Sequence, residues 1–211
     1  MPTTAAPAAG LADQVARELR ERILTGDLGS GRPLRESALA ATHAVSRNTV
    51  REAFRLLARD RLVVHEAHKG VAVRTLTPDD VRDIYRVRLA LEPAGLALVD
   101  PDELAAVVAV ARRAAAADDW RAVSTADLRF HQVVVAALGS PRFDEMFTSV
   151  LAEQRLAFAQ VASGRDLHAP YLERNAAMVE MLRRGELQAT ESELRDYLRT
   201  ARDQLCDAVA V

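Results

Sequence analysis

The segment HAVSRNTVREAFRLLARD, residues 43–60, decides how the first third of this chain folds. Apolar residues recur in it at helical spacing and form one face: Val50, Phe54 and Leu57. Arginines form a separate stripe: Arg47, Arg51 and Arg55. The positive charge begins in the first two turns, where a helix that meets a polyanion end-on needs it. We therefore predict an amphipathic helix directed at a polyanion; the alternative is an ordinary helix with a solvated charged face.

The residues before this helix predict a helix-turn-helix. A short helix over residues 36–42, with Leu39 buried, is followed by a three-residue turn. Ser46 is the expected N-cap of the next helix, because its side chain can accept from the amide of Asn48 or Thr49. An earlier helix begins near Leu11 and ends before the glycine at position 26.

The residues after Asp60 change from helical to alternating periodicity. LVVHEAHKGVAVRTL, residues 62–76, predicts a two-stranded hairpin with Lys69 and Gly70 in the turn, which is the wing of a winged helix. Thr77 then caps a new helix whose first residue is Pro78. From there no strand is predicted, and six helices are expected over residues 78–98, 101–117, 120–138, 141–163, 167–184 and 186–209.

The predicted fold is therefore mainly α. We expect a disordered tail (1–10), a winged helix-turn-helix with a small β-hairpin wing (11–76), and an all-α bundle of six to seven helices (77–211). Charge separates the two domains: residues 1–78 hold 12 Lys and Arg against 8 Asp and Glu, and the rest hold 16 against 22. The basic first domain is the one that suits a polyanion.

Composition restricts the class of protein. Hydrophobic residues make up 49% of the 211 and aromatic residues only 4%, which favours helix. Cys206 is the only cysteine, so neither an intrachain disulfide nor a cysteine cluster for zinc can form. The chain has no long uncharged apolar run and no basic, apolar leader. We expect a cytoplasmic protein without a membrane partner.

The predicted partner of the first domain is double-stranded DNA. In a helix-turn-helix the second helix enters the major groove by its N-terminal end, where Arg and Asn read guanine and adenine edges. A glycine turn with a lysine at the wing tip suits a phosphate or minor-groove contact. The residues assigned to DNA are Arg35, Ser46, Arg47, Asn48, Thr49, Arg51, Lys69 and Gly70.

A family resemblance supports this assignment. Residues 19–63, LRERILTGDLGSGRPLRESALAATHAVSRNTVREAFRLLARDRLV, resemble the winged-helix domain of the GntR family of bacterial transcription regulators. Two positions depart from the family pattern. Ala44 stands where a turn glycine is usual, and Arg61 replaces the glycine after the recognition helix. Either Arg61 adopts a left-handed backbone at some strain, or the helix ends differently.

The second domain resembles the FCD effector domain of the FadR-like subgroup. The matching segments are DDVRDIYRVRLALEPAGLAL (79–98) and DLRFHQVVVAALGSPRF (127–143). The resemblance implies an all-α bundle around a pocket for a small organic ligand, often a carboxylate. It also implies, in many members, a bound divalent metal.

The metal site implied by the resemblance is incomplete in this chain. Asp127 and His131 lie four residues apart, share a helix face and could form half of a site for a first-row metal. Two histidines that complete the site in metal-binding relatives align with Asn175 and Tyr197, which are poor ligands. The alternative is that Asp127 and His131 hydrogen-bond within the pocket. We therefore assign no certain cofactor.

A polar ligand pocket is expected instead, lined by Arg88, Asp127, His131, Asn175 and Tyr197. Arg88 is the expected partner of a ligand carboxylate, although it could equally pair with Glu92 four residues later.

These observations together predict a ligand-responsive regulator that binds a palindromic operator as a homodimer. Two other classes remain as alternatives. A metal-dependent enzyme would leave the arginine stripe unexplained, and a structural nucleoid protein would not need base-reading side chains.

Overall fold

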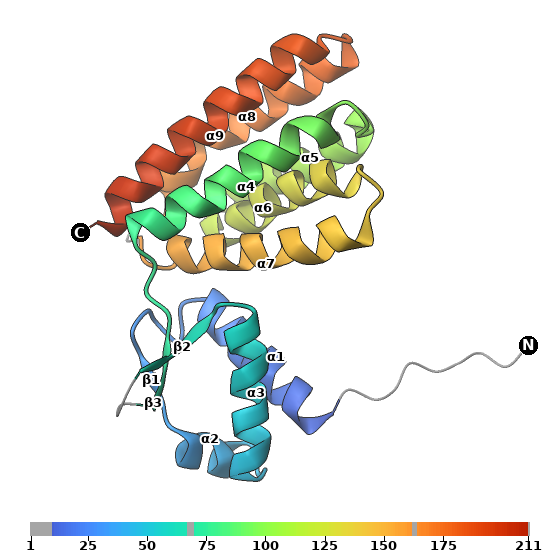
Figure 1. Cartoon of the computed structure of the whole chain (residues 1–211). Helices are drawn as coiled ribbons and strands as arrows, with labels where there is room; N and C mark the ends of the chain where they lie inside the picture. The colour runs from blue at the N-terminus through green and yellow to red at the C-terminus, as the bar shows by residue number, and fades with distance from the viewer. Residues whose placement is uncertain (1–9, 67–69, 162–163, 211) are drawn as a thin grey trace, which may run out of the picture. The chain divides into compact units, whose positions relative to one another are not determined.

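The computed structural model describes residues 10–66, 70–161 and 164–210. The chain divides into two compact units, Met1–Thr75 and Leu76–Val211, which are considered one at a time (Figure 1). Lys69 and all but the last residue of the expected tail lie outside the described residues. Within the described residues the fold is mainly α with one small antiparallel sheet, as the sequence predicted.

The described residues of the N-terminal unit form three helices: α1 (Leu11–Leu24), α2 (Glu36–Thr42) and α3 (Arg47–Arg59). They also form three strands: β1 (Pro33–Leu34), β2 (Val63–Glu66) and β3 (Gly70–Val73). Helices α2 and α3 form the predicted helix-turn-helix, and β2 pairs with β3 as the predicted hairpin.

The core of this unit forms between α1 and α3. Val50, Phe54 and Leu57 are buried, as their spacing predicted, and they lie on the α3 face that packs on α1. The prediction for Leu39 was wrong, because this residue is only half-buried and no residue of α2 is fully buried. A helix of seven residues at the edge of a unit has its neighbours on one side only.

The wing has one more strand than predicted. The sheet order is β1-β3-β2, with Leu34 opposite Val71 on the outer edge of β3. Strand β1 contains two residues and one is a proline, which lacks a backbone donor, so neither alternation nor propensity indicates it. Only its pairing with β3 defines it.

Both departures from the family pattern adopt a left-handed backbone. The φ angle is 51° at Ala44 and 56° at Arg61. Of the two alternatives for Arg61, the strained one is therefore correct: α3 ends at Arg59 and the chain turns immediately into β2. Side chains with a Cβ adopt this conformation at a cost of about 1–2 kcal/mol each.

The second unit is a bundle of the six predicted helices, and no described helix is long and apolar enough to cross a membrane. Their bounds are α4 (Pro78–Leu96), α5 (Pro101–Ala116), α6 (Trp120–Ala136), α7 (Pro141–Phe158), α8 (Gly164–Arg183) and α9 (Leu187–Val209). Thr77 and Asp80 form a reciprocal capping box at the start of α4. Two bounds differ from prediction by three residues or more: α7 ends at residue 158 rather than 163, and α8 begins at residue 164 rather than 167.

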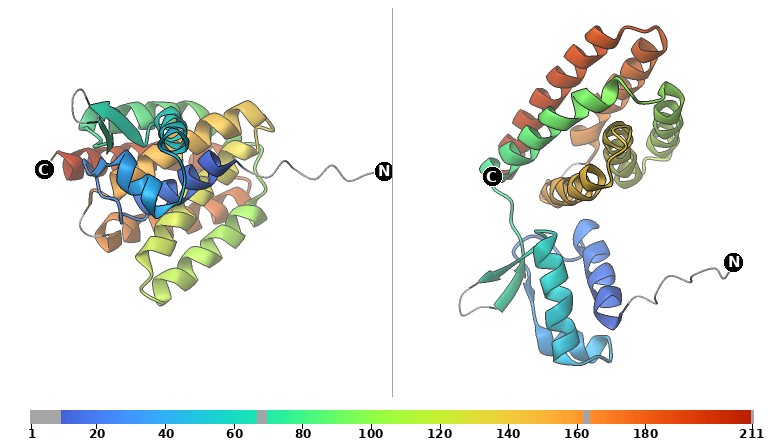
Figure 2. Two further views of the ribbon diagram at one scale, coloured as in Figure 1. Left: turned by 90° about the horizontal axis from the view of Figure 1, so that it is seen from below. Right: turned by 45° about the vertical axis from the view of Figure 1, so that its right-hand side comes forward.

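Helix α6 is the central helix of the bundle. It contacts α4, α5, α7 and α8, while α9 packs beside α4 and α8 (Figure 2). Helices α4 and α6 approach very closely, since a Cβ placed on Gly95 would lie 2.0 Å from the carbonyl oxygen of Val134. This approach brings the polar side chains of α4 against those of α6.

Candidate functional site

The N-terminal end of α3 is an exposed site suited to anions. Ser46 caps the helix by accepting from the amide of Thr49 at 3.0 Å, and the two hydroxyl oxygens lie 2.8 Å apart. Arg47 and Asn48 are exposed in the first turn, and no described residue forms a hydrogen bond with either side chain. A helix N-terminus with free side-chain donors attracts negative charge.

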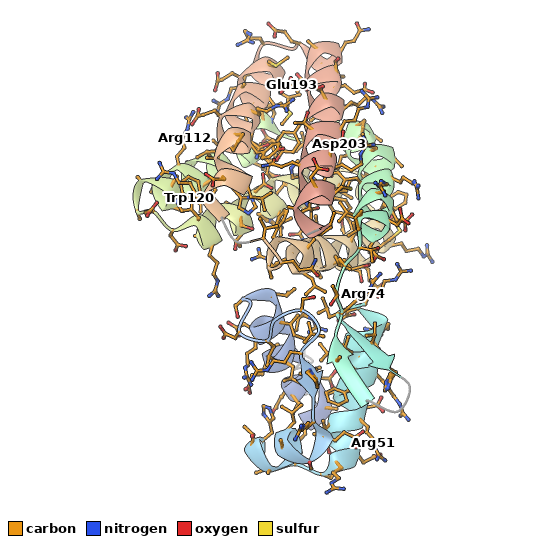
Figure 3. All side chains as sticks on the ribbon, turned by 90° about the vertical axis from the view of Figure 1, so that its left-hand side faces the viewer. Arg51, Arg74, Arg112, Trp120, Glu193 and Asp203 are labelled. Atoms are coloured by element: carbon orange, nitrogen blue, oxygen red, sulfur yellow. The ribbon has the colours of Figure 1, made fainter. Side chains whose placement is uncertain are left out.

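Arg51 is held by a residue of the preceding helix. Its Nε lies 3.0 Å from both carboxylate oxygens of Glu36 on α2, yet the arginine side chain remains 60% exposed (Figure 3). Hydrogen bonding to Glu36 raises the pKa of Arg51 above its ordinary value. The ion pair fixes the direction of the guanidinium and leaves its terminal nitrogens for another acceptor.

The other residues assigned to DNA lie in two places. Arg35 is the exposed residue directly before α2, and Gly70 begins β3 with a φ of 91°. Lys69 cannot be placed, since it lies outside the described residues. Arg55, the last arginine of the stripe, pairs with Glu52 on its own helix at 2.8 Å. The structure therefore brings the first two arginines of the stripe, but not Arg55, to the open end of α3.

The predicted pocket residues meet inside the second unit, in a network buried between five helices. Tyr197 on α9 donates to Asp127 Oδ1 on α6 at 2.7 Å, and its hydroxyl oxygen lies 3.2 Å from His131 Nε2. Asn175 on α8 donates to the same Asp127 oxygen at 2.9 Å. Four of the five predicted pocket residues thus contact one another directly.

The network continues through Glu92, which the sequence suggested only as a partner for Arg88. The Glu92 carboxylate lies 2.6 Å from Arg88 Nε and 2.7 Å from His131 Nδ1. Arg88 then donates to Gln154 on α7 at 2.9 Å. The pairing of Arg88 with Glu92 within α4 is therefore real, and the contact of Glu92 with His131 connects α4 to α6.

The pKa values of the buried acids follow from this geometry. Burial alone would raise the pKa of Glu92, but Arg88 and His131 lower it below its ordinary value. Burial likewise opposes ionisation of Asp127, and His131 with His168 lowers the pKa of that carboxyl. Both acids are therefore ionised at neutral pH, which requires their neighbours to stay in place.

One donor of Arg88 is left over. Arg88 is 1% exposed, and its Nη2 forms no hydrogen bond with any described residue. A buried guanidinium nitrogen without an acceptor is costly, so this group can bind an incoming carboxylate in a short, charge-assisted hydrogen bond. Asn175 has the opposite need. Its side-chain oxygen is buried and accepts no hydrogen bond from any described residue, so it can accept one from a ligand.

A divalent metal does not fit this donor set. The Tyr197 hydroxyl lies between Asp127 and His131, whose nearest polar atoms are 3.9 Å apart. Burial and then the Asp127 charge hold the pKa of Tyr197 well above its ordinary value, so the phenol keeps its proton and is a weak ligand. Among residues that the structure describes, no group of three or more His, Cys, Asp or Glu side chains could hold a metal.

His168 belongs to the site but was missed by the sequence analysis. It lies on α8 and is 4% exposed, with its ring edge-on to Phe158 at a centroid distance of 4.7 Å. Burial lowers its pKa and Asp127 opposes this effect, so the imidazole is neutral at neutral pH. The available signal was its position two helical turns before Asn175, on the same face of α8.

Two small cavities adjoin this network, each with a volume of about 10 Å³, which is room for about one water molecule. The polar cavity is lined by Tyr85, Arg88, Asp127, Gln154, Phe158, Leu167, His168, Tyr171, Tyr197 and Ala201. The apolar cavity is lined by Val107, Val108, Ala111, Val123, Ala126, Asp127, Phe130, His168, Leu172 and Asn175. Only Asp127 and His168 line both. The site can therefore offer a cation, a carboxylate and an apolar surface to one small molecule.

Two family models match the chain. Residues 11–73 match the model described as bacterial regulatory proteins of the gntR family, and residues 83–200 match the FCD domain. A solved structure, a transcriptional regulator GntR from Rhodococcus sp. RHA1, is 38% identical with a TM-score of 0.88, covering 93% of this chain and 98% of that one.

Curated relatives are transcriptional regulators. An HTH-type regulator of Agrobacterium vitis is 34% identical over 61% of this chain and 81% of its own length. The gluconate operon transcriptional repressor of Bacillus licheniformis is 34% identical over 59% of this chain and 54% of its own length. This chain spans about half the length of that repressor and of two further relatives from Bacillus subtilis. None of these relatives is named as an enzyme.

Proposed function

We propose that this chain, which belongs to the GntR family of bacterial regulatory proteins and carries an FCD domain, is a ligand-responsive transcription regulator that binds operator DNA. The observation that carries the proposal is the open N-terminal end of α3, where Arg47, Asn48 and Arg51 project from a helix-turn-helix. The basic charge of residues 1–78 favours the same partner.

The operator is a two-fold symmetric sequence bound by a homodimer. One winged helix buries too little surface for specific affinity, so two copies reading two half-sites are required. Helix α7 offers apolar surface for self-association, since Phe143 is 39% and Met146 43% exposed. The regulator acts in the cytoplasm, where the operator lies.

The effector is a small organic acid that binds inside the bundle. Its carboxylate pairs with Arg88, whose Nη2 is buried and has no acceptor among the described residues. Asp127, His131, Asn175 and Tyr197 form the adjoining polar wall. The chain does not depend on a metal to hold this acid, because the Tyr197 hydroxyl occupies the position between Asp127 and His131.

The test starts from DNA. The full-length chain is used to select sequences from a random duplex pool, and the enriched sequence is titrated at several salt concentrations. We expect a palindromic site and a steep loss of affinity with salt, because Lys and Arg release counterions from the phosphates they contact. Failure to enrich any sequence, or an affinity that does not change with salt, would contradict operator binding.

A further inference from the structure

Three arginines on one face of the bundle have no acidic partner among the described residues. Arg121 and Arg129 lie about two turns apart on the outer side of α6, and Arg155 of α7 donates to Thr125 between them at 3.0 Å. Burial and then the nearby charge of Arg121 lower the pKa of Arg155, since no described carboxylate pairs with either cation. In residues 79–211 acids outnumber bases by 22 to 16, so a positive face is a local departure that suits a negatively charged partner.

A solvent-exposed groove of about 580 Å³ lies along this face, between α5 and α6. It is lined by Val107, Val110, Asp119, Arg121, Ala122, Thr125, Ala126 and Arg129. Val110 is 47% exposed, and Asp119 accepts from the amide of Ala122 at 2.9 Å. A single chain therefore exposes hydrocarbon edged by positive charge in this groove, which is a surface suited to a partner.

Helix α7 lies on the other side of α6 from the groove. Helices α5 and α7 both pack on α6, from opposite sides (Figure 2). Arg155, near the end of α7, bonds Thr125 near the start of α6, whereas Gln132 further along α6 donates to Thr148 at 3.4 Å. The two helices are therefore antiparallel, and the first turns of α7 lie beside the end of α6.

The first turns of α7 carry two acids that pair with no described residue. These are Asp144 and Glu145, of which Glu145 is exposed. Arg142 in the same turns leaves this end of the helix with one net negative charge. Glu145 shares its helix face with Ser149 and Ala152, which are small enough to let another helix approach closely. The layer of α6 and α7 is therefore positive at one end and negative at the other.

We infer that, in the homodimer, the groove between α5 and α6 receives α7 of a second copy, with Glu145 of the partner subunit facing Arg121. A two-fold axis perpendicular to the layer and through the middle of α6 produces this arrangement, because it reverses α6 and moves α7 to the side of α5. The same contact then forms twice, and the association closes at two copies. This inference rests on the proposed homodimer and specifies its surface.

Charge and hydrocarbon contribute differently to this contact. An exposed ion pair adds little affinity, but like charges that face each other oppose association, so the charged ends select the register. With α6 of the two copies parallel, the arginine ends would face each other; the antiparallel arrangement brings each arginine end to an acidic end. The affinity comes from covering Val110 and the alanines of the groove.

The first experiment reverses the charges in the full-length chain. Sedimentation equilibrium gives the dimer dissociation constant of Arg121→Glu, of Glu145→Arg and of the variant with both changes. We expect each single change to raise this constant about tenfold or more, since the like charges meet twice in the dimer, and the double variant to recover most of the loss. Asp207→Arg, at an exposed acid of α9, is the matched control and should leave the constant unchanged.

Two results would overturn the inference while leaving a homodimer in place. One is an unchanged dissociation constant in both single variants, and the other is no recovery in the double variant. A chain that stays monomeric while it binds its selected operator would contradict the proposed homodimer as well.

The second experiment tests the position of α7. Within one chain Val110 and Ser149 lie on helices that flank α6 from opposite sides, whereas the inferred dimer brings Val110 next to Ser149 of the partner subunit. Oxidation of the variant with both Val110→Cys and Ser149→Cys should give a disulfide-linked dimer, since a disulfide requires Cα atoms within about 7 Å. Each single variant and the wild-type chain, whose Cys206 is buried, are the controls and should stay monomeric in denaturing electrophoresis. Equal cross-linking in the single variants, or none in the double variant, would overturn the placement of α7 in the groove.

Discussion

The two units of this chain use charged side chains in opposite ways. At the end of α3, Arg47 and Arg51 are exposed, and Arg51 keeps 60% of its surface in solvent while paired with Glu36. Inside the bundle, Arg88 and Glu92 are 1% and 0% exposed and each depends on its partner. An exposed charge can be removed at little cost to folding, whereas removal of one partner of a buried pair leaves the other charge buried and uncompensated. The first unit is suited to binding, and the network of the second also supports the fold.

The largest expected effect comes from breaking the buried pair. Glu92→Ala leaves Arg88 charged, buried and without its carboxylate, so the free energy of unfolding should fall by about 3–5 kcal/mol. Glu52→Ala is the matched control, since Glu52 forms the exposed pair with Arg55. Chemical denaturation of both variants measures the difference. Similar losses in the two variants would contradict the contrast between the units.

A second change would convert the buried network into a metal site. In the double variant Asn175→His and Tyr197→His, two imidazoles join Asp127 and His131, which provides four good ligands. We expect zinc at a hundred times its dissociation constant to stabilise the variant by about 2.7 kcal/mol and the wild-type chain hardly at all. Thermal unfolding with and without zinc measures this. Tight zinc binding by the wild-type chain would show that Tyr197 does not replace the metal.

Removing an exposed charge should affect binding without affecting the fold. Arg51→Ala should weaken binding to the selected operator roughly tenfold to hundredfold, while binding of the acid effector and the unfolding transition remain unchanged. Arg113→Ala, at an exposed arginine of α5, controls for the loss of one positive charge. Operator titrations of both variants at constant salt measure the difference in affinity. An unchanged affinity in Arg51→Ala would remove this residue from the DNA interface.

The neutral, buried His168 predicts a pH dependence of stability. Its pKa is below the ordinary 6.5, so under pH 6.5 the unfolded chain binds a proton at His168 that the folded chain does not. The stability that the neutral imidazole contributes is fully present above pH 6.5. As the pH falls from 6.5 towards the folded pKa, the free energy of unfolding decreases by at most about 1.4 kcal/mol per pH unit. Denaturation midpoints between pH 7 and 5 should fall less in His168→Asn than in wild type. Parallel curves would contradict a depressed pKa.

The smallest effect is expected at a turn. Ala44→Gly removes the Cβ from a residue whose φ is 51°, which should stabilise the chain by about 1 kcal/mol. The Glu92 pair is far away in sequence and should be unaffected. Thermal unfolding of the variant checks the sign. A loss of stability would mean that the gain in unfolded-chain entropy exceeds the relief of strain.

Much of the fold could be predicted because its signals are local. The Ser46 cap, the Thr77 cap with Pro78, and the buried face of α3 each depend on residues no more than about two turns apart. The left-handed turn at Arg61 was one of two alternatives that the missing glycine left open, and the structure decided between them. Strand β1 could not be predicted, since a two-residue strand exists only through its pairing with β3.

In the candidate sites, too, single residues could be predicted from the sequence but their contacts could not. The sequence indicated the polar residues of the candidate pocket one by one. It did not show that Tyr197 lies between Asp127 and His131, or that Glu92 joins Arg88 to His131, 39 residues later. His168 gave no signal beyond its place on α8. Arg51 was assigned to DNA without its partner Glu36, 15 residues earlier.

By itself, the sequence determined the helices, their caps, the helix-turn-helix and the inventory of charged groups, because hydrophobic periodicity and capping act over a few residues. Only the tertiary structure decided which charges are exposed and which are paired. Burial and pairing depend on helices far apart in the chain: α4 touches α6 at Gly95, and α9 brings the Tyr197 hydroxyl to Asp127. The residue type determines whether a side chain can carry a charge. The dielectric and the partners that the fold places around it determine how much that charge costs in free energy and what it can bind.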